Sequence, residues 1–266
     1  MILNNKKNNP TVSIIMPAFN AGKTIKASID SVVAQTYCNW ELIVIDDGSQ
    51  DTTLQIIKDA ADGDSRICVE VNEHNMGVAS TRNVGIARAK GMWIAFLDAD
   101  DLWINDKLSK QLRFMKHHDA LISYTSTAYI NEKGEASGYI LEAKLRISYK
   151  ELLWRNLMSC SSVIVRRDIM PFFTQGEVHE DYVAWLTILR KVGHAYGLNE
   201  PLLTYRIAAN SKSHKRLRSA RMIFNAYKQV EYGWISALFM TMRYVVHSVP
   251  KRLYIRYFAA DEGGMN

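Results

Sequence analysis

The sequence predicts an α/β fold built on a mainly parallel sheet with helices on both faces, followed by a helical C-terminal tail. Strand and helix signals alternate regularly over residues 12–98, which is typical of parallel strands joined by crossover helices. The strand segments are almost uninterruptedly apolar, as expected for strands that are covered on both faces.

Each element of the N-terminal half has its own signal in the sequence. The first apolar, β-branched run ends at Pro17, and the second stops at the turn signal Asp47-Gly48-Ser49. The first helix is indicated by the helical spacing of Ile25, Ile29 and Val32. The expected strands are 12–16, 41–46, 67–71 and 92–98, and the expected helices are 21–35, 51–62 and 77–91.

The second half of the chain has a less regular pattern. Strands are expected near 121–129 and 161–166, and an amphipathic helix begins at Glu180. The tail, residues 217–257, mixes basic and aromatic residues, and its most apolar run is broken by Arg243 and His247. We therefore do not expect the tail to span a bilayer.

The net charge of +6 is concentrated in this tail, where Glu231 is the only acidic residue between 212 and 256. A basic, aromatic helix of this kind fits peripheral contact with an anionic membrane. It equally fits a helix pair packed on the main domain with a solvated basic face, and both interpretations stay open. No nucleic acid is expected as a partner, because no recognisable binding module accompanies the basic residues.

The sequence also indicates a compartment. Residues 1–10 are polar, contain no signal-peptide core and are expected to form a disordered lead. Cys38, Cys68 and Cys160 have neither disulfide-framework nor metal-ligand spacing. We expect a cytoplasmic protein, located at the inner face of the plasma membrane if the tail binds lipid.

Polar clusters follow three of the expected strands. They are Pro17-Ala18-Phe19-Asn20, Asp46-Asp47-Gly48-Ser49 and Asp98-Ala99-Asp100-Asp101. In open parallel sheets, ligands bind where loops converge at the carboxyl ends of the strands. The three clusters are therefore expected to form one site.

The acidic cluster Asp98-Ala99-Asp100-Asp101 has two possible explanations. Neighbouring carboxylates repel one another unless a cation neutralises them, and Mg²⁺ or Mn²⁺ can do so while bridging to nucleotide phosphates. The alternative is a solvated acidic turn that caps the next helix. The motif alone is too short to decide.

The acidic cluster is one of four segments that occur in a fixed order between Val12 and Leu108. They are PAFN (17–20), ELIVIDDGSQDTT (41–53), NMGVASTRNVGIARAKG (75–91) and IAFLDADDLWINDKL (94–108). This stretch resembles the family 2 glycosyltransferases, which have the GT-A fold. Two later segments, HEDYVAWLTILRKVG (179–193) and NEPLLTYRIAANSKS (199–213), carry a weaker resemblance to enzymes that build bacterial surface polysaccharides, of the O-antigen and teichuronic acid types.

The resemblance implies roles for named residues. Asp47 would accept a hydrogen bond from uracil or ribose, and Asp98 would reach the ribose. Arg82 would face the pyrophosphate, as suits a guanidinium, or would simply pair with a surface acid. Asp100 would bind Mn²⁺ or Mg²⁺. The nucleoside pocket would be lined by Pro17, Ala18 and Phe19.

Asp181 is implied as the general base, because the Asp of the Glu-Asp pair has this role in the family. On the residues alone, a carboxylate at a helix N-terminus is also explained by the helix dipole. A single displacement by an activated hydroxyl inverts the anomeric centre. Tyr205-Arg206 departs from many relatives in lacking a His shortly afterwards, and His214 is left out of the site.

The organisation implied is a nucleotide-sugar-binding half at 11–118, an acceptor-binding half at 119–210 and the tail at 211–266. The donor would be a UDP-hexose or UDP-N-acetylhexosamine, and the acceptor a polyprenyl-pyrophosphate-linked glycan. Two alternatives are a catalytically silent sugar-nucleotide-binding scaffold and, more distantly, a nucleotidyltransferase. The latter normally has a Gly-rich basic loop after the first strand, whereas PAFNAGK has one Gly and one Lys.

Overall fold

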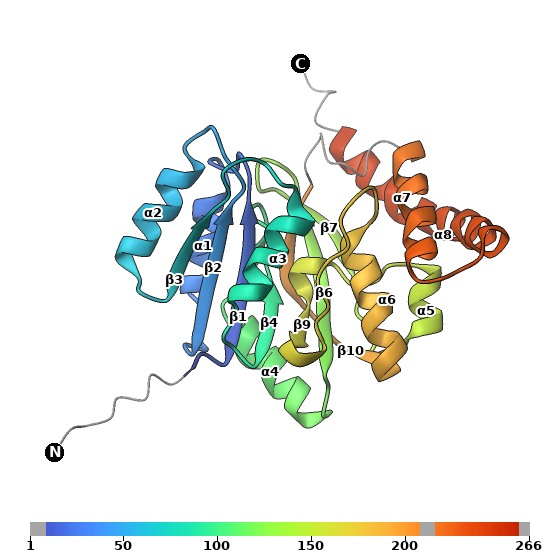
Figure 1. Cartoon of the computed structure of the whole chain (residues 1–266), viewed down its shortest axis with the longest axis horizontal. Helices are drawn as coiled ribbons and strands as arrows, with labels where there is room; N and C mark the ends of the chain where they lie inside the picture. Colours follow the sequence, from blue (N-terminus) through green and yellow to red (C-terminus); the bar gives the residue numbers. More distant parts are fainter. Residues whose placement is uncertain (1–8, 208–215, 261–266) are drawn as a thin grey trace.

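The computed structural model describes residues 9–207 and 216–260 of the chain. One mixed sheet runs through the molecule in the order β3-β2-β1-β4-β9-β6-β10-β5, with β7 beside β6 and β8 beside β10 (Figure 1). Most of the expected N-terminal lead, and His214, lie outside the described residues.

The N-terminal half confirms the predicted parallel sheet. β1 pairs in parallel with both β2 and β4, and β2 pairs in parallel with β3. The observed strands are β1 (Val12–Ala18), β2 (Trp40–Asp46), β3 (Ile67–Val71) and β4 (Trp93–Phe96). The helices between them are α1 (Ile25–Val33), α2 (Thr53–Gly63) and α3 (Val78–Arg88).

The second half continues the same sheet. β9 (Ile164–Arg166) lies antiparallel between β4 and β6 (Ile122–Ile130), and β10 (His194–Arg206) runs parallel to β6. The expected strand at 161–166 starts only at Ile164, because Cys160–Ser162 form the short helix η1. The short antiparallel strands are β5 (Leu102–Trp103), β7 (Ala136–Leu141) and β8 (Arg146–Ser148).

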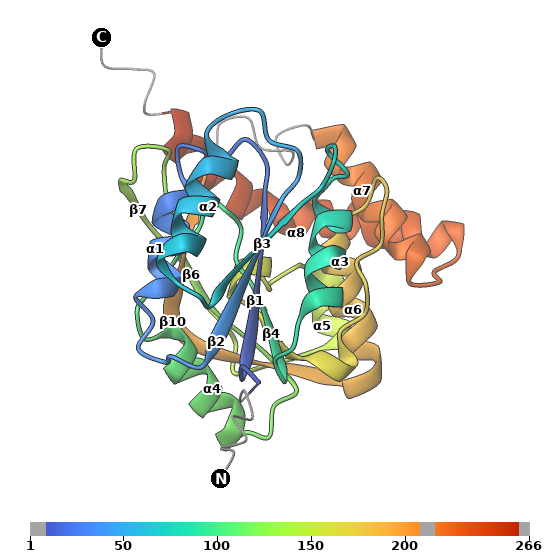
Figure 2. The same cartoon turned by 60° about the vertical axis from the view of Figure 1, so that its left-hand side comes forward.

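Helices cover both faces of the sheet, as predicted. α1, α2 and α4 (Lys107–His117) lie on one face, and α3, α5 (Tyr149–Trp154) and α6 (Glu180–Val192) lie on the other (Figure 2). α3 approaches the sheet closely at Gly85, where an added Cβ would lie 2.5 Å from Ile15 Cγ2. This contact fixes the helix that carries Arg82.

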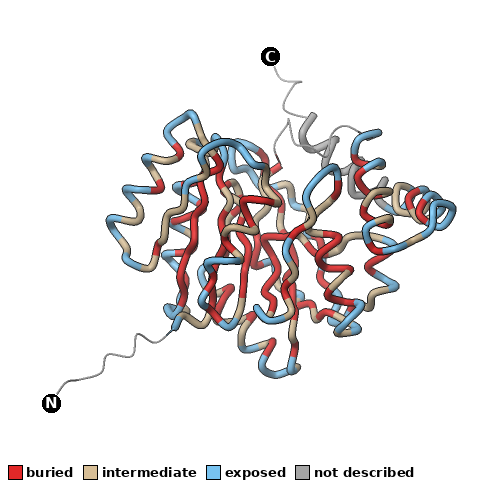
Figure 3. The backbone as a smooth tube through the Cα atoms, in the orientation of Figure 1, coloured by how far each residue is buried: buried red, intermediate tan, exposed pale blue. Residues whose placement is uncertain are grey.

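The tail forms two helices, α7 (Arg216–Gln229) and α8 (Trp234–Ala260), beside α5 and α6 (Figure 1). Ile223, Ala226 and Tyr227 of α7 are buried in the core together with residues of α6. Figure 3 shows buried stretches on the tail helices among exposed ones. Within residues 9–207 and 216–260, no helix combines the length and apolar character needed to cross a membrane.

Candidate active site

A cavity of about 2240 Å³ opens where β1, β2 and β4 end. The three polar clusters predicted to meet there do so, since Phe19, Asp47 and Asp100 all line it. The opposite side is formed by the segments around Ser159 and His179 and by α7 and α8. Sites for one small molecule usually occupy about 300–1,000 Å³, so this cavity has room for two substrates.

The end of β1 supplies the proposed nucleoside wall. Pro17 and Ala18 end the strand, and Phe19, which is 48% exposed, lines the cavity. The following loop is tied to the end of β2, because Asn20 N donates to Ser49 Oγ and Gln50 N donates to Asn20 Oδ1. These residues offer an apolar, partly aromatic wall on a fixed loop, which suits stacking of a base.

Asp47 organises the loop that precedes α3. Its Oδ1 accepts hydrogen bonds from Asn72 Nδ2 (2.8 Å) and Met76 N (2.9 Å), and its Oδ2 accepts one from Gly77 N (2.9 Å). Gly77 has a φ of 84°, which favours glycine. An ionised carboxylate has about four acceptor positions, so Asp47 retains capacity for one hydrogen bond to a nucleoside.

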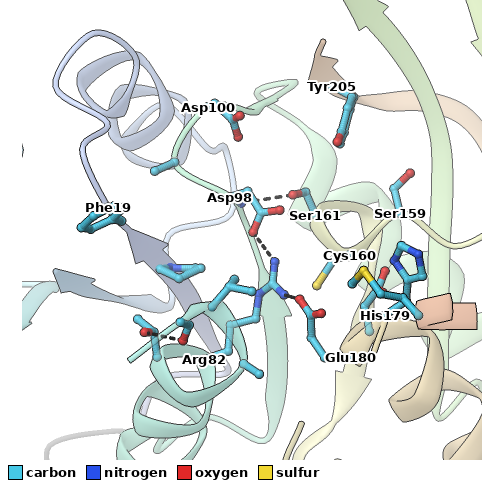
Figure 4. Close-up of a pocket in the computed structure, with 18 of the residues that line it drawn as sticks. Phe19, Arg82, Asp98, Asp100, Ser159, Cys160, Ser161, His179, Glu180 and Tyr205 are labelled. Carbon is cyan, nitrogen blue, oxygen red and sulfur yellow. Dashed lines mark hydrogen bonds and ion pairs between the residues drawn. The ribbon is translucent and has the colours of Figure 1, made fainter. Parts of the chain in front are cut away.

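Arg82 lies between two carboxylates and is only 4% exposed. Its Nη2 lies 2.5 Å from Asp98 Oδ1, and its Nη1 lies 2.8 Å from Glu180 Oε1 (Figure 4). Burial opposes the charged form, but Asp98, Cys160 and Glu180 hold the pKa of Arg82 well above its ordinary value. Arg82 therefore joins the end of β4 to the start of α6. The acids that it pairs with belong to the site and not to the open surface.

The acidic cluster after β4 fits a divalent cation. Asp101 is fully buried, its Oδ1 accepts from Arg206 N (3.1 Å), and its Oδ2 has no hydrogen-bond partner within the described residues. Burial and the charge of Asp98 raise the pKa of Asp100 to about 6. Carboxylates that are not neutralised by the protein suit a hard cation.

The protein alone does not complete a coordination sphere. In the ranges 9–207 and 216–260, no group of three or more His, Cys, Asp or Glu side chains is placed to hold a metal ion. Mg²⁺ and Mn²⁺ are commonly bound by one or two carboxylates together with substrate phosphates. The residues present therefore fit an ion that is shared with a bound diphosphate.

Asp181 begins α6 beside Glu180. Burial, followed by the charge of Glu180, raises the pKa of Asp181 to about 7. Its Oδ2 lies 3.5 Å from Asn156 Nδ2, and Asn156 Oδ1 accepts from Met158 N (3.1 Å), which orients the amide. A carboxylate with a pKa near the working pH is suited to general base catalysis.

Several site residues were missed by the sequence analysis. Asp98 N donates to Ser161 Oγ (3.1 Å) (Figure 4), and Trp103 Nε1 donates to Ser161 O (2.8 Å). Arg206 Nε donates to Asp100 O (3.1 Å). The sequence predicts a strand at Ser161, and Asn156 belongs to no motif, so only Arg206 of the Tyr205-Arg206 pair carries a signal in the sequence.

The mixed sheet, with carboxylates gathered at the ends of its parallel strands, defines a nucleotide-dependent transferase of the GT-A type. Residues 13–168 match the family described as Glycosyl transferase family 2. The chain belongs to that family, and it is a glycosyltransferase. A nucleotidyltransferase is therefore no longer an alternative.

Relatives cover most of the chain. The "Putative teichuronic acid biosynthesis glycosyltransferase TuaG" of Bacillus subtilis is 33% identical over 247 residues, which are 92% of this chain and 98% of that protein. The Escherichia coli "UDP-Glc:alpha-D-GlcNAc-diphosphoundecaprenol beta-1,3-glucosyltransferase WfgD" is 34% identical over 246 residues, which are 91% of this chain and 95% of that protein.

A solved structure supports the fold. The "Mannosyltransferase PcManGT from Pyrobaculum calidifontis in complex with GDP-Man and Mn2+" has a TM-score of 0.69 at 16% identity and covers 97% of this chain and 77% of that chain. At this identity the likeness establishes the GT-A architecture alone.

Proposed function

We propose that this protein is a metal-dependent, inverting glycosyltransferase of bacterial surface polysaccharide synthesis. It moves a sugar from a UDP-hexose or UDP-N-acetylhexosamine to a hydroxyl of a polyprenyl-pyrophosphate-linked glycan. One observation carries the proposal: Asp181, with its pKa raised to about 7, shares one cavity with the acidic cluster that ends in Asp100. A base and a diphosphate-binding group are thereby available to two adjacent substrates.

The chain's own residues divide the work. Pro17, Ala18 and Phe19 hold the nucleoside, Asp47 accepts a hydrogen bond from uracil or ribose, and Asp98 reaches the ribose. Arg82 contributes positive charge beneath the diphosphate while it is held by Asp98 and Glu180.

Asp181 takes the proton of the acceptor hydroxyl as that oxygen bonds to the anomeric carbon and the bond to UDP breaks. The single displacement converts an α-linked donor into a β-linked product. Asp100 would hold Mn²⁺ or Mg²⁺, which when bound supplies positive charge for the leaving diphosphate.

The relatives' names support the finer assignments. WfgD is named as using UDP-Glc and a diphosphoundecaprenol-linked acceptor, and TuaG is named for teichuronic acid biosynthesis. With a lipid-linked acceptor, the proposed place of action is the inner face of the plasma membrane. The predicted halves at 11–118 and 119–210 are proposed as the donor and acceptor sides of the cavity.

The test is calorimetric titration of UDP with and without Mn²⁺, on wild type, Asp100→Ala and the control Asp168→Ala. Asp168 is an exposed acid that pairs with Arg166. We expect Mn²⁺-dependent binding that is lost in Asp100→Ala and retained in Asp168→Ala. If UDP, GDP and dTDP all fail to bind to wild type, the proposal is wrong. If binding occurs without turnover of any UDP-sugar, the silent scaffold is favoured. An α-linked product, assigned by NMR, would exclude the inverting mechanism.

A further inference from the structure

The acceptor side of the cavity contains an arginine whose guanidinium forms no ion pair or side-chain hydrogen bond with any described residue. Arg82 pairs with Asp98 and Glu180, and Arg218 lies 3.7 Å from Glu177. Arg155 also lines the cavity, yet nothing in residues 9–207 and 216–260 forms an ion pair or a side-chain hydrogen bond with it. A guanidinium has five N–H donors in a planar fork that matches phosphate oxygens, so Arg155 is available to an anion.

Arg155 lies close to the candidate base along the chain. The next residue, Asn156, contacts Asp181 through its oriented amide at 3.5 Å. Consecutive Cα atoms are about 3.8 Å apart, so a sugar whose hydroxyl reaches Asp181 can place its opposite side near Arg155. Lys23, the other cavity-lining cation without a partner in the described ranges, lies beyond β1 on the donor side.

The surrounding charge makes this arrangement selective. Asp98, Asp100, Glu180 and Asp181 all line the cavity, and they would repel an acceptor phosphate that met no cation. We propose that Arg155 binds the phosphate or diphosphate attached to the acceptor sugar. This inference rests on the proposed function, because it presupposes that an acceptor hydroxyl is held at Asp181.

The test compares two soluble acceptors, an N-acetylglucosamine diphosphate alkyl ester and the uncharged alkyl N-acetylglucosaminide. Their binding to the UDP-loaded protein is measured by calorimetry for wild type, Arg155→Met, Arg155→Lys and the control Arg113→Met, an exposed residue of α4 outside the cavity. In Arg155→Met we expect the affinity for the diphosphate ester to fall by about 10- to 100-fold, the range for one charge-assisted hydrogen bond. Arg155→Lys should lose less affinity for the diphosphate ester than Arg155→Met, and the affinity for UDP should be unchanged in both variants.

Other results would overturn the subsite. They are no binding of the diphosphate ester to wild type, equal binding to wild type and Arg155→Met, or equal weakening of both acceptors. Weakened UDP binding in Arg155→Met would show that Arg155 belongs to the donor side of the cavity and not to the acceptor side. Because the readout is binding, an ester that binds through Arg155 but receives no sugar contradicts the proposed function and leaves the subsite intact.

A second surface is indicated independently by α8. Eight residues between Trp234 and His247 are exposed, and six of them are large and apolar. Their exposed fractions run from 54% to 87%, and their spacing places them on one face of the helix. The six residues are Trp234, Ile235, Leu238, Phe239, Met242 and Val246. We call them the apolar face of α8.

The opposite side of α8 is already packed. Ala237 and Thr241 are buried, and Tyr244 lies 5.6 Å from Tyr182 between ring centroids. Figure 3 shows exposed turns of α8 at the outer edge of the molecule. An apolar face of this kind on a helix that cannot cross the bilayer is typical of a helix lying in the membrane interface.

The charge around this face selects the lipid. Among the described side chains of α7 and α8, Arg218 and Arg221 pair with Glu177, whereas Lys228 Nζ lies 5.9 Å from the ring centroid of Trp234 on the apolar face. The single acid between the helices, Glu231, pairs with Arg190. Basic residues beside an apolar helix face attract anionic headgroups. We infer that the apolar face of α8 docks on an anionic bilayer.

The position of the cavity agrees with this orientation. Val245 of α8 lines the cavity, and the next residue, Val246, belongs to the apolar face. A lipid-linked acceptor would thus enter the cavity from the bilayer on which α8 lies.

The test is flotation of the full chain with vesicles of phosphatidylcholine alone or with phosphatidylglycerol. The variant is Leu238→Glu/Phe239→Glu, and the matched control is Leu145→Glu/Phe172→Glu, whose residues are 60% and 62% exposed elsewhere. Wild type and control should float with the anionic vesicles. The bound fraction of the α8 variant should fall at least about tenfold, because burial of two large apolar side chains is lost.

UDP affinity, measured in parallel, should be equal in all three proteins, so a folding defect or a failed donor site is seen separately. Equal flotation of variant and control, or no flotation of wild type, would overturn the membrane surface. A wild-type dimer that only the α8 variant dissociates, seen by analytical ultracentrifugation, would instead assign the face to a second copy of this chain.

Discussion

Replacing Asp181 with Asn removes a carboxylate that the fold makes difficult to ionise. Its ordinary pKa of 3.8 is raised to about 7, first by burial and then by Glu180. Between these two pKa values, Asp181 keeps its proton in the folded protein and has released it in the unfolded chain. Stability is therefore highest below the unfolded pKa and falls as pH rises towards about 7. Asn does not ionise, so the variant should escape this loss.

The size of the effect follows from the shift. Each pKa unit corresponds to about 1.4 kcal/mol. Between pH 5 and pH 8, roughly two pH units lie between the unfolded and the folded pKa of Asp181, and the loss of stability accumulates over these two units. Partial solvent access of Asp181 makes this loss smaller. The free energy of unfolding of Asp181→Asn, relative to wild type, should increase by about 1–3 kcal/mol over this interval. Urea unfolding at pH 5 and pH 8 measures it.

Glu180→Gln is the matched control, because it changes the adjacent carboxylate in the same way. It removes one of the two partners of the buried Arg82, and Asp98 remains. We expect it to be less stable than wild type at pH 8, by about 3 kcal/mol, near the low end for a broken buried pair. Neighbouring amide substitutions should thus have opposite effects on stability.

The same Asp181→Asn variant should lose kcat by about 100- to 10,000-fold, the usual contribution of a general base, with UDP affinity unchanged. A variant that keeps kcat within about tenfold of wild type would remove Asp181 from the proton transfer. The argument from burial would be refuted if Asp181→Asn were less stable than wild type at pH 8 and its stability relative to wild type did not increase between pH 5 and pH 8.

Three other predictions concern the same site. The rate of transfer should fall as pH drops below about 7, where Asp181 takes up a proton, and a pH profile of kcat with saturating substrates measures this. Arg82→Met should lower the free energy of unfolding by about 3–5 kcal/mol, because Asp98 and Glu180 lose their buried cation; urea unfolding would contradict this if stability were unchanged. Asp47→Ala should lower it by about 1–3 kcal/mol, since two backbone N–H groups lose their acceptor, and should also weaken UDP binding in calorimetry.

The sequence was sufficient for the elements whose burial is encoded locally. β1, β2 and β4 are apolar along nearly their whole length because helices cover both faces, so their positions and the convergence of Phe19, Asp47 and Asp100 could be predicted. Phe19 and Asp47 follow their strands directly and Asp100 comes four residues after the end of β4, and the ends of parallel strands meet at one edge of the sheet.

The parts that could not be predicted depend on long-range contacts. Arg82 and Glu180 are 98 positions apart, and nothing in either helix indicates that they pair. Ser161 lies in a polar-to-apolar segment that was expected to be strand, yet Cys160–Ser162 turn as a short helix before β9 begins. Asn156 acquires its role only because its loop lies beside the start of α6.

The Arg82 ion pairs also bear on how the two substrate sides cooperate. The predicted boundary near residue 118 separates the acidic cluster from the base, but β9 pairs with β4 on one side and β6 on the other, so one sheet runs through both halves. Arg82 adds a second connection, from Asp98 at the donor side to Glu180 beside Asp181. Glu180 in turn contributes to the raised pKa of Asp181. The acidic cluster on the donor side and the candidate base are therefore linked by one set of buried charges, which explains why neither half of the sheet forms the site alone.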